Sequence, residues 1–184
     1  GTQNVNFKYI VFRGDIQINE YNSGNSTIVG HANASGAITV GAVRYNNTPA
    51  NGVNPPLVED FSSKGGTPVN GVMINKPDIC GPNGVNTTVF LGGPDLEADN
   101  LPNFFGTSAA APHIAGLAAL LKSASQKYEA QGLTPLQVKT LMTNSTIDMA
   151  APGFDFETGF GFIQADLALK TMASPSPVAY NIKV

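Results

Sequence analysis

The longest run of apolar positions lies at residues 109–121, directly after the small turn Gly106-Thr107-Ser108. Within this run His113 is the only polar side chain. A helix of this composition is apolar all round, so the pattern predicts a helix that is buried on every side. A hydroxyl in its first turn lies near free backbone N–H groups and the positive end of the helix dipole, which favour developing negative charge. The pattern therefore makes Ser108 a candidate nucleophile.

Shorter apolar runs bounded by turn-forming residues predict strands. The run at residues 37–43 is nearly continuous, as in a strand that is buried on both faces. Further strands are expected at residues 8–12, 16–18, 72–74 and 88–91. The first two of these form a short N-terminal β-hairpin around Arg13-Gly14-Asp15, a triplet that is more typical of a turn here than of an adhesion motif. Residues 76–84 are expected to form a loop.

Two more helices are expected after the central one. The second begins at Thr134, which can cap it, with Pro135 at the first helical position and Gln137 completing a capping box. The third is expected at residues 165–172. The apolar faces of the first two helices are expected to consist of Ile114, Leu117, Ala118 and Leu121, and of Leu136, Val138, Leu141 and Met142. Strands that alternate with helices favour an α/β fold.

Composition and charge exclude several classes of protein. The net charge of −3 and the pI near 5.2 argue against nucleic acid or an anionic membrane as the main partner. The apolar run is shorter than the roughly 20 residues needed to span a bilayer, and the sequence contains no signal peptide. Cys80 is the single cysteine, so no internal disulfide can form. It is equally compatible with a small buried residue and with a reactive thiol.

An acidic segment, Asp95-Leu96-Glu97-Ala98-Asp99, carries carboxylates two residues apart, which is compatible with calcium binding. The sequence contains no specific calcium motif, however, and a solvated loop is the favoured interpretation. We therefore expect that no cofactor is required.

The Ser108 segment becomes far more specific as part of a longer pattern. Residues 106–116 read Gly-Thr-Ser-Ala-Ala-Ala-Pro-His-Ile-Ala-Gly, and other landmarks stand in a matching order at residues 30–42, 61–65, 76–79 and 159–165. These stretches resemble the subtilisin-like (subtilase, S8-type) serine proteases over about residues 28–172. The resemblance implies a partial doubly wound, mainly parallel sheet flanked by helices. It also implies hydrolase activity on polypeptides.

By this resemblance, Ser108 is the catalytic nucleophile and its own backbone N–H contributes to the oxyanion hole. A serine hydroxyl needs a neighbouring base, and the base needs an orienting group. In subtilisins the catalytic residues follow the order Asp, His, Ser along the chain. Both partners are therefore expected upstream of Ser108.

Neither partner motif occurs in the chain. His31 is followed by Ala and His113 by Ile, and no Asp-Thr-Gly or Asp-Ser-Gly is present. A regular helix would place His113 about 140° around the axis from Ser108 and about 7.5 Å along it, which is unsuitable for a base. We expect His113 to be buried and hydrogen-bonded to neighbouring loops. His31 matches a position at the pocket wall rather than the base.

Two other residues are relevant to the family pattern. Asn25 stands in a Gly-Asn turn, the form of the family's oxyanion asparagine, but it lies closer to residues 30–31 than the pattern requires. A solvent-facing turn residue is the favoured interpretation of Asn25. Asp78 matches a landmark aspartate and is expected to be structural, because its carboxylate can accept hydrogen bonds from backbone N–H groups of the loop.

Two interpretations of function remain open. In the first, the chain is the serine-bearing C-terminal part of a serine endopeptidase, acting through an acyl-enzyme on Ser108, with the triad Asp and His in a missing N-terminal half. The chain alone would then be inactive. In the second, it is a catalytically incomplete protease-like domain that binds peptide or a partner protein.

The same resemblance gives the expected organisation of the chain. Residues 1–22 form the end of an inserted β-domain, residues 23–174 the catalytic part, and residues 175–184 a tail. A secreted or cell-surface location is implied. Because a sheet cut before its first strands exposes an apolar edge, we also expect self-association through that edge.

Overall fold

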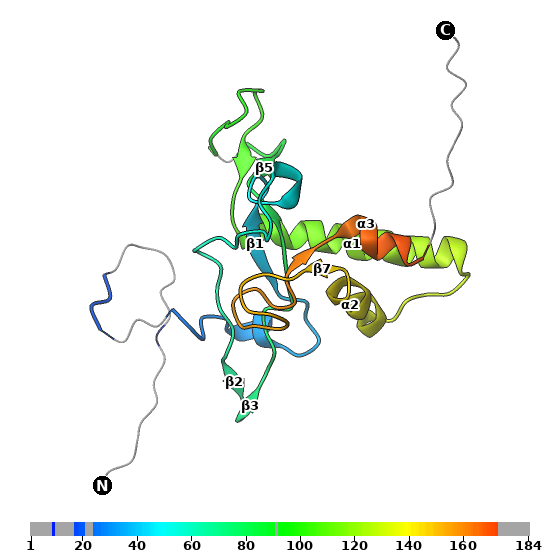
Figure 1. The fold of residues 1–184 in the computed structure, drawn as a ribbon, viewed down its shortest axis with the longest axis horizontal. Helices are drawn as coiled ribbons and strands as arrows, with labels where there is room; N and C mark the ends of the chain where they lie inside the picture. Colours follow the sequence, from blue (N-terminus) through cyan, green and yellow to red (C-terminus); the bar gives the residue numbers. More distant parts are fainter. Residues whose placement is uncertain (1–8, 10–16, 21–23, 91, 173–184) are drawn as a thin grey trace.

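The computed structural model describes residues 9, 17–20, 24–90 and 92–172 (Figure 1). The Arg13-Gly14-Asp15 triplet and the tail from residue 175 lie outside this part of the chain. The predicted N-terminal hairpin also lies outside it, apart from residues 9, 17 and 18, which belong to no strand.

A four-stranded sheet forms the centre of the described structure. Its order is β1 (Val40–Arg44), β4 (Ile79–Asn83), β8 (Phe162–Ile163) and β7 (Thr146–Ile147). The first three strands are parallel and β7 is antiparallel to β8. The prediction of a mainly parallel sheet is therefore confirmed. Two small antiparallel hairpins project from it, β2 (Pro68–Val69) with β3 (Val72–Met73), and β5 (Val85–Asn86) with β6 (Asn103–Phe104).

Three helices lie together on one side of the view in Figure 1. The long helix α1 (Thr107–Tyr128) packs on β1 and β4, while α2 (Pro135–Thr143) and α3 (Ala165–Lys170) pack against α1 and each other. Short 3-10 turns, η1 (Gly30–Asn33) and η2 (Pro49–Asn51), precede and follow β1. The core between helices and sheet contains the fully buried Ile79, Leu121 and Met142, each of which stabilises the fold by about 1.5–3 kcal/mol.

The central strand β4 occupies a segment, residues 76–84, for which the sequence pattern predicted a loop. Pro82 lacks a backbone N–H and normally breaks an interior strand. The N–H of Cys80 donates to Gly161 on the β8 side of β4, at 2.8 Å. Since backbone groups alternate along a strand, Pro82 faces this same side, where β8 pairs only with Cys80. The missing N–H therefore costs the sheet no ladder bond.

The strand predicted at residues 88–91 was wrong, because residues 87–90 have no strand structure. The Val89 N–H bonds locally to Thr87 Oγ1 at 3.1 Å, an alternative to sheet pairing that threonine offers. Val89 and Phe90 are exposed, at 54% and 73%. β-propensity alone does not form a strand where no buried face is available.

Helix α2 begins as predicted. Thr134 accepts the Gln137 N–H at 3.3 Å and Gln137 Oε1 accepts the Thr134 N–H at 2.9 Å, so the capping box is confirmed. Its predicted apolar face is confirmed for Val138 and Met142 but is wrong for Leu136, which is 73% exposed. Leu136 lies in the first turn of α2 and does not belong to the core cluster that contains Val138 and Met142.

Candidate active site

Ser108 is the second residue of α1, and its side chain is exposed. The residue before the helix, Gly106, has no side chain to cap it, and its carbonyl accepts the N–H groups of Ala109 and Ala110 at 2.9 and 3.2 Å. Within the described part of the chain, the backbone N–H groups of Thr107 and Ser108 have no acceptor. Two free N–H donors and the positive end of a 22-residue helix therefore lie beside the hydroxyl.

The turn before Ser108 is held by the end of β4. Asn83 Oδ1 accepts the Gly106 N–H at 3.2 Å, and the Gly84 N–H donates to the Phe104 carbonyl at 2.9 Å. Asn103 Nδ2 donates to the Gly84 carbonyl, also at 2.9 Å. Sequence reasoning missed Asn83 and Asn103, although Asn83 stands directly before Gly84 and Asn103 stands three residues before Gly106.

Asn103 is the centre of a polar cluster under the acidic segment. Its amide donates to Asn86 Oδ1 at 3.1 Å and to Glu97 Oε2 at 2.8 Å, and its Oδ1 accepts the Leu96 N–H at 2.7 Å. Tyr45 also donates to Glu97, and this bond and that from Asn103 lower the pKa of the Glu97 carboxyl. The cluster fixes the acidic segment against the base of β6.

The two aspartates of the acidic segment accept backbone N–H groups of the same loop, and Asp99 also accepts the side-chain amide of Asn86. Asp95 accepts the N–H groups of Asp99 and Asn100 at 3.1 and 2.8 Å, and Asp99 accepts that of Leu101 at 2.9 Å. Among the described residues, no group of three or more His, Cys, Asp or Glu side chains is arranged to hold a metal ion.

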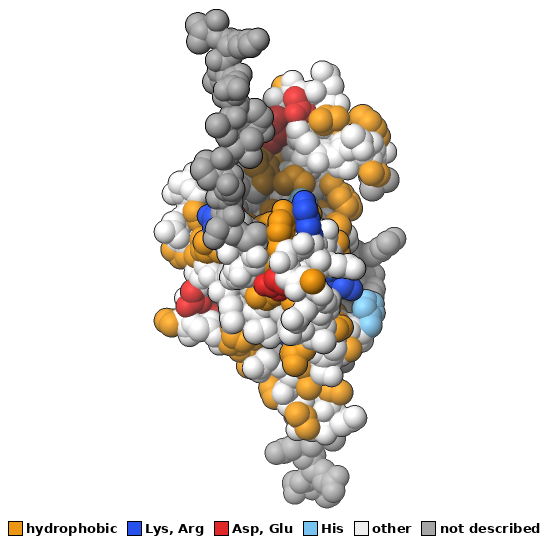
Figure 2. All heavy atoms as spheres, turned by 90° about the vertical axis from the view of Figure 1, so that its right-hand side faces the viewer, with side chains coloured by type: hydrophobic (Ala, Val, Ile, Leu, Met, Phe, Trp, Pro, Cys, Tyr) orange, Lys and Arg blue, Asp and Glu red, His pale blue; other side chains and the backbone are white. Residues whose placement is uncertain are grey.

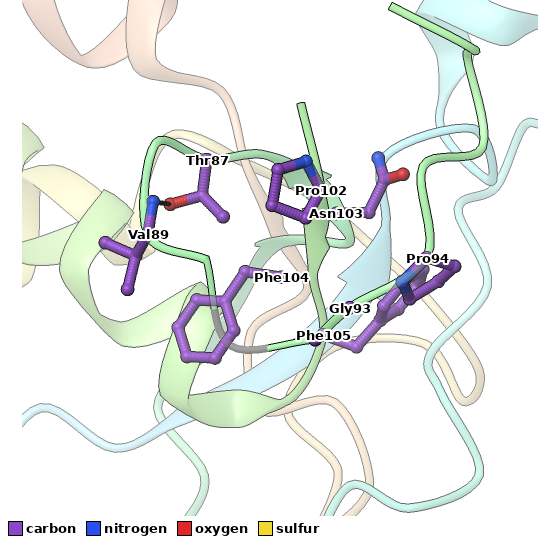
Figure 3. A pocket seen from close by; sticks show the side chains of 9 residues that line it. Thr87, Val89, Gly93, Pro94, Pro102, Asn103, Phe104 and Phe105 are labelled. Atoms are coloured by element: carbon purple, nitrogen blue, oxygen red, sulfur yellow. Dashed lines mark hydrogen bonds between the residues drawn. The ribbon is translucent and has the colours of Figure 1, made fainter. Parts of the chain in front are cut away.

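A pocket of about 300 Å³ opens beside the turn, between the β5–β6 hairpin and its loop (Figure 3). Its lining is largely apolar and includes Phe104, four residues before Ser108. The full lining is Thr87, Val89, Gly92, Gly93, Pro94, Pro102, Asn103, Phe104 and Phe105. In Figure 3 the Phe104 ring points toward Val89, and the Val89–Thr87 hydrogen bond closes the turn at the rim.

One of the two histidines, His113, lies in a different environment from that expected. His113 is exposed, not buried, and its Nδ1 lies 2.8 Å from the Ala109 carbonyl of its own helix rather than against a neighbouring loop. The prediction failed because no described segment covers this side of α1. His31 is exposed in η1, and Asn25 is exposed in the segment before it.

The outer face of α1 is apolar and exposed, which corrects the prediction of a helix buried on every side. Ile114, Leu117 and Leu121 face the core as predicted. The opposite face continues the line of Ser108 and consists of Ala111, Pro112, Ala115, Gly116, Ala119 and Leu120. Figure 2, which faces the side of the molecule toward which the helices extend in Figure 1, shows exposed hydrophobic side chains in several places among polar and charged groups.

Asp78 holds the start of β4 as expected of a structural aspartate. It is 2% exposed, and its Oδ2 accepts the Thr39 N–H at 2.7 Å. Two cationic partners, which no sequence pattern predicted, add to this bond. Lys76 Nζ lies 2.7 Å from the same oxygen, and Lys139 of α2 forms an ion pair with the other. Asp78 thereby ties β1, β4 and α2 together.

Cys80 is fully buried in β4, with Sγ 3.5 Å from the Thr158 carbonyl. Burial raises the pKa of its thiol to about 12. Because the thiolate is the reactive form, this cysteine is a packing residue rather than a nucleophile.

The model of the subtilase family (peptidase S8) matches residues 14–161. The chain belongs to the subtilase family. Fervidolysin of Fervidobacterium pennivorans is 29% identical to this subtilase chain over 175 residues, which cover 89% of the chain and 23% of fervidolysin. Minor extracellular protease Vpr of Bacillus subtilis is 37% identical over 126 residues, covering 67% of the chain and 15% of Vpr.

Solved structures agree with this subtilase fold. The crystal structure of fervidolysin, described as a keratinolytic enzyme related to subtilisin, matches with a TM-score of 0.50 and 28% identity over 80% of this chain and 20% of that one. The maturation protease PagA matches with a TM-score of 0.58 over 83% of this chain and 48% of its own, at 21% identity. The chain thus spans about a fifth of the curated relatives' length. No helix in the described segments is long and apolar enough to cross a membrane.

Proposed function

We propose that this subtilase chain is the serine-bearing part of a serine endopeptidase. Ser108 attacks the scissile carbonyl of a polypeptide, the C–N bond breaks, and the C-terminal part of the substrate leaves as an amine. Water then hydrolyses the acyl-enzyme, which releases the N-terminal part as a carboxylic acid and restores the Ser108 hydroxyl. The observation that carries the proposal is the exposed Ser108 hydroxyl in the first turn of α1, beside two backbone N–H groups without an acceptor in the described part of the chain. Such donors stabilise the oxyanion of the tetrahedral intermediate.

A base and an orienting acid must come from elsewhere. Ser108 Oγ has no hydrogen-bond partner among the described residues, and His113 is turned toward its own helix. We propose that the triad Asp and His belong to a further part of the catalytic domain, which precedes these residues in the complete protein. On this account the chain alone is inactive.

The exposed face of α1 is the proposed contact surface for that further part. It starts at Ser108 and runs for three turns as small apolar side chains, which allow close approach of another element. Exposed Leu120, at 57%, marks its far end. If the further part of the catalytic domain packs on this face, its Asp and His can lie near the N-terminal end of α1, where Ser108 is.

The pocket beside Phe104 is proposed to receive an apolar side chain of the polypeptide substrate. No cofactor takes part in this proposal, because a base and an oxyanion hole suffice for acyl transfer. Since Vpr is called extracellular, we extend a secreted or cell-surface location to this chain.

Peptide hydrolysis by the complete catalytic domain tests the proposal. Ser108→Ala is expected to lower kcat by about 10⁶-fold, the scale on which nucleophile removal acts in serine proteases. Ser123→Ala, an exposed serine on the same helix, is the matched control and should leave kcat unchanged. Full activity in Ser108→Ala would overturn the proposal. Absence of hydrolysis by the unmodified domain would favour the alternative, a protease-like domain that binds peptide or a partner protein.

A further inference from the structure

We propose that Asn83 is a positioning residue that sets the place of Ser108 through the backbone of Gly106. This inference rests on the proposed role of Ser108 as nucleophile. In this proposal Asn83 does not touch the reacting atoms. Its side chain holds the turn at Gly106, from which helix α1 begins.

The helix has no cap of its own at this end. Gly106 has φ 119° and ψ 165°, and no side chain caps the first turn. This φ lies in the region that only glycine adopts without strain. A turn made of glycine is conformationally free in the unfolded chain, so its orientation depends on contacts from outside.

Asn83 supplies a contact from outside the helix at Gly106, only two residues before Ser108. It is 0% exposed at the end of β4, and its Oδ1 accepts the Gly106 N–H at 3.2 Å. Its carbonyl accepts the Tyr45 N–H at 2.9 Å, which fixes its backbone to the end of β1. The amide therefore transmits the position of the sheet to the first turn of α1.

Glu59 orients the Asn83 side chain. Asn83 Nδ2 donates to Glu59 Oε1 at 3.4 Å, so the opposite atom, Oδ1, faces Gly106. The Glu59 N–H in turn donates to the Ala42 carbonyl at 2.8 Å, which anchors this segment along β1. The order Glu59–Asn83–Gly106 leaves one orientation of the amide in which both bonds form.

The consequence concerns catalysis more than folding. Two further bonds join the segment before the turn to Gly84, the residue after β4: the Gly84 N–H donates to the Phe104 carbonyl, and Asn103 Nδ2 donates to the Gly84 carbonyl. These retain the hairpin when Asn83 is changed. The Gly106 bond is nearest to Ser108, and a displacement of a catalytic group by about 1 Å can cost about 10²-fold in rate.

Amide hydrogen exchange on this chain tests the contact without reference to activity. In the unmodified chain, Gly106 is expected to exchange at least about tenfold more slowly than Thr107 and Ser108, which have no acceptor among the described residues. Asn83→Leu, which keeps the volume and removes the acceptor, should abolish this difference while the amides of α1 beyond its first turn stay protected. Equal exchange at Gly106, Thr107 and Ser108 in the unmodified chain would overturn the inference, whether or not Asn83→Leu folds.

Kinetics of the complete catalytic domain test the positioning role. Asn83→Leu is expected to lower kcat by about 10- to 100-fold with KM changed by less than about twofold. Asn83→Asp keeps the acceptor but sets a carboxylate against Glu59. The double variant Asn83→Asp with Glu59→Gln restores a donor–acceptor pair, so it should recover most of kcat. A normal kcat in Asn83→Leu, or no recovery in the double variant, would overturn the positioning role.

These outcomes are separable from those of the proposed function. If Ser108→Ala retains activity, the nucleophile is wrong, while Gly106 exchange still reports on Asn83. If Ser108→Ala is inactive and Asn83→Leu has a normal kcat, the nucleophile stands and the positioning inference fails.

Discussion

Lys76 Nζ lies 2.7 Å from Asp78 Oδ2, with both side chains nearly inaccessible, at 1% and 2%. A buried ion pair contributes little relative to an apolar pair of equal shape, but removing one partner leaves an uncompensated charge in the interior. Because Lys139 keeps its ion pair with the other oxygen of Asp78, we predict that Lys76→Met lowers the free energy of unfolding by about 3 kcal/mol, the lower end of the range for breaking a buried pair. Urea denaturation measures the change.

The pair Lys170–Asp166 on α3 is the matched control for this prediction. It has a similar length, 2.8 Å, but its side chains are 53% and 62% exposed. Solvent screens such a pair, so Lys170→Met is expected to leave the free energy of unfolding nearly unchanged. Similar losses in the two variants would contradict the role assigned to Asp78 and Lys76.

The stability of the chain should depend on the Cys80 thiol at alkaline pH. Its pKa in the folded state is about 12, whereas an exposed thiol titrates near about 8.5. The unfolded state therefore loses this proton first. The contribution of Cys80 is complete below about pH 8.5 and falls by up to about 1.4 kcal/mol per pH unit above it. In Cys80→Ala, the loss of unfolding free energy between about pH 8.5 and pH 10.5 should be smaller.

Denaturation at several pH values measures this difference between the two slopes. The baseline stability of Cys80→Ala is expected to be lower because a buried group is removed, and this offset does not affect the slope. Equal slopes, or rapid modification of the native thiol by a disulfide reagent near neutral pH, would contradict the buried, protonated state of Cys80.

Replacement by alanine should have opposite effects on stability at two glycines, Gly116 on the exposed face of α1 and Gly81 in β4, which packs against the other face of α1. A Cβ added at Gly116 meets no atom within 4 Å, so Gly116→Ala should raise unfolding free energy by about 0.5–1 kcal/mol through helix propensity. A Cβ at Gly81 of β4 would lie 3.1 Å from Ile114 Cδ1 and 3.2 Å from the Ala110 carbonyl. Gly81→Ala should destabilise the chain by about 1–3 kcal/mol. Thermal denaturation of both variants measures these changes in unfolding free energy. Destabilisation by Gly116→Ala would contradict the exposure of the outer face of α1.

The exposed face of α1 should also make the isolated chain associate with itself. The strand edge at β1 is partly occupied, because the Glu59 N–H bonds to Ala42 and Ser62 Oγ accepts the Ala42 N–H at 2.9 Å. The outer face of α1, by contrast, has no covering segment among the described residues. We predict concentration-dependent association by analytical ultracentrifugation, and its loss in Ala115→Arg. A sharp monomer at high concentration in the unmodified chain would contradict this prediction.

Local signals in the sequence predicted local structure well. The Thr134 capping box and the core face of α1 depend on residues a few positions apart, so their geometry follows from spacing. The landmarks around Ser108 are short contiguous motifs, and their order along the chain was sufficient to indicate the family. These features need no knowledge of distant segments.

Features that depend on distant neighbours were missed. Gly81 and Pro82 look like loop residues, and only the short β8 pairing explains how they form the central strand. The composition of α1 indicates a helix that can be buried all round, but exposure depends on which other segments are present. The bond from Asn83 to Gly106 spans 23 residues and has no local signature.

Labelling with a fluorophosphonate probe, located by mass spectrometry, tests the central claim that Ser108 is a nucleophile whose base lies outside this chain. The complete catalytic domain should be labelled at Ser108 and at no other serine. The isolated chain should react at least about 10²-fold more slowly, because general-base assistance contributes about 10²–10⁴. Rapid labelling of the isolated chain that Ser108→Ala abolishes would contradict the account, since the base would then lie within these residues. So would an active complete domain that carries no label at Ser108.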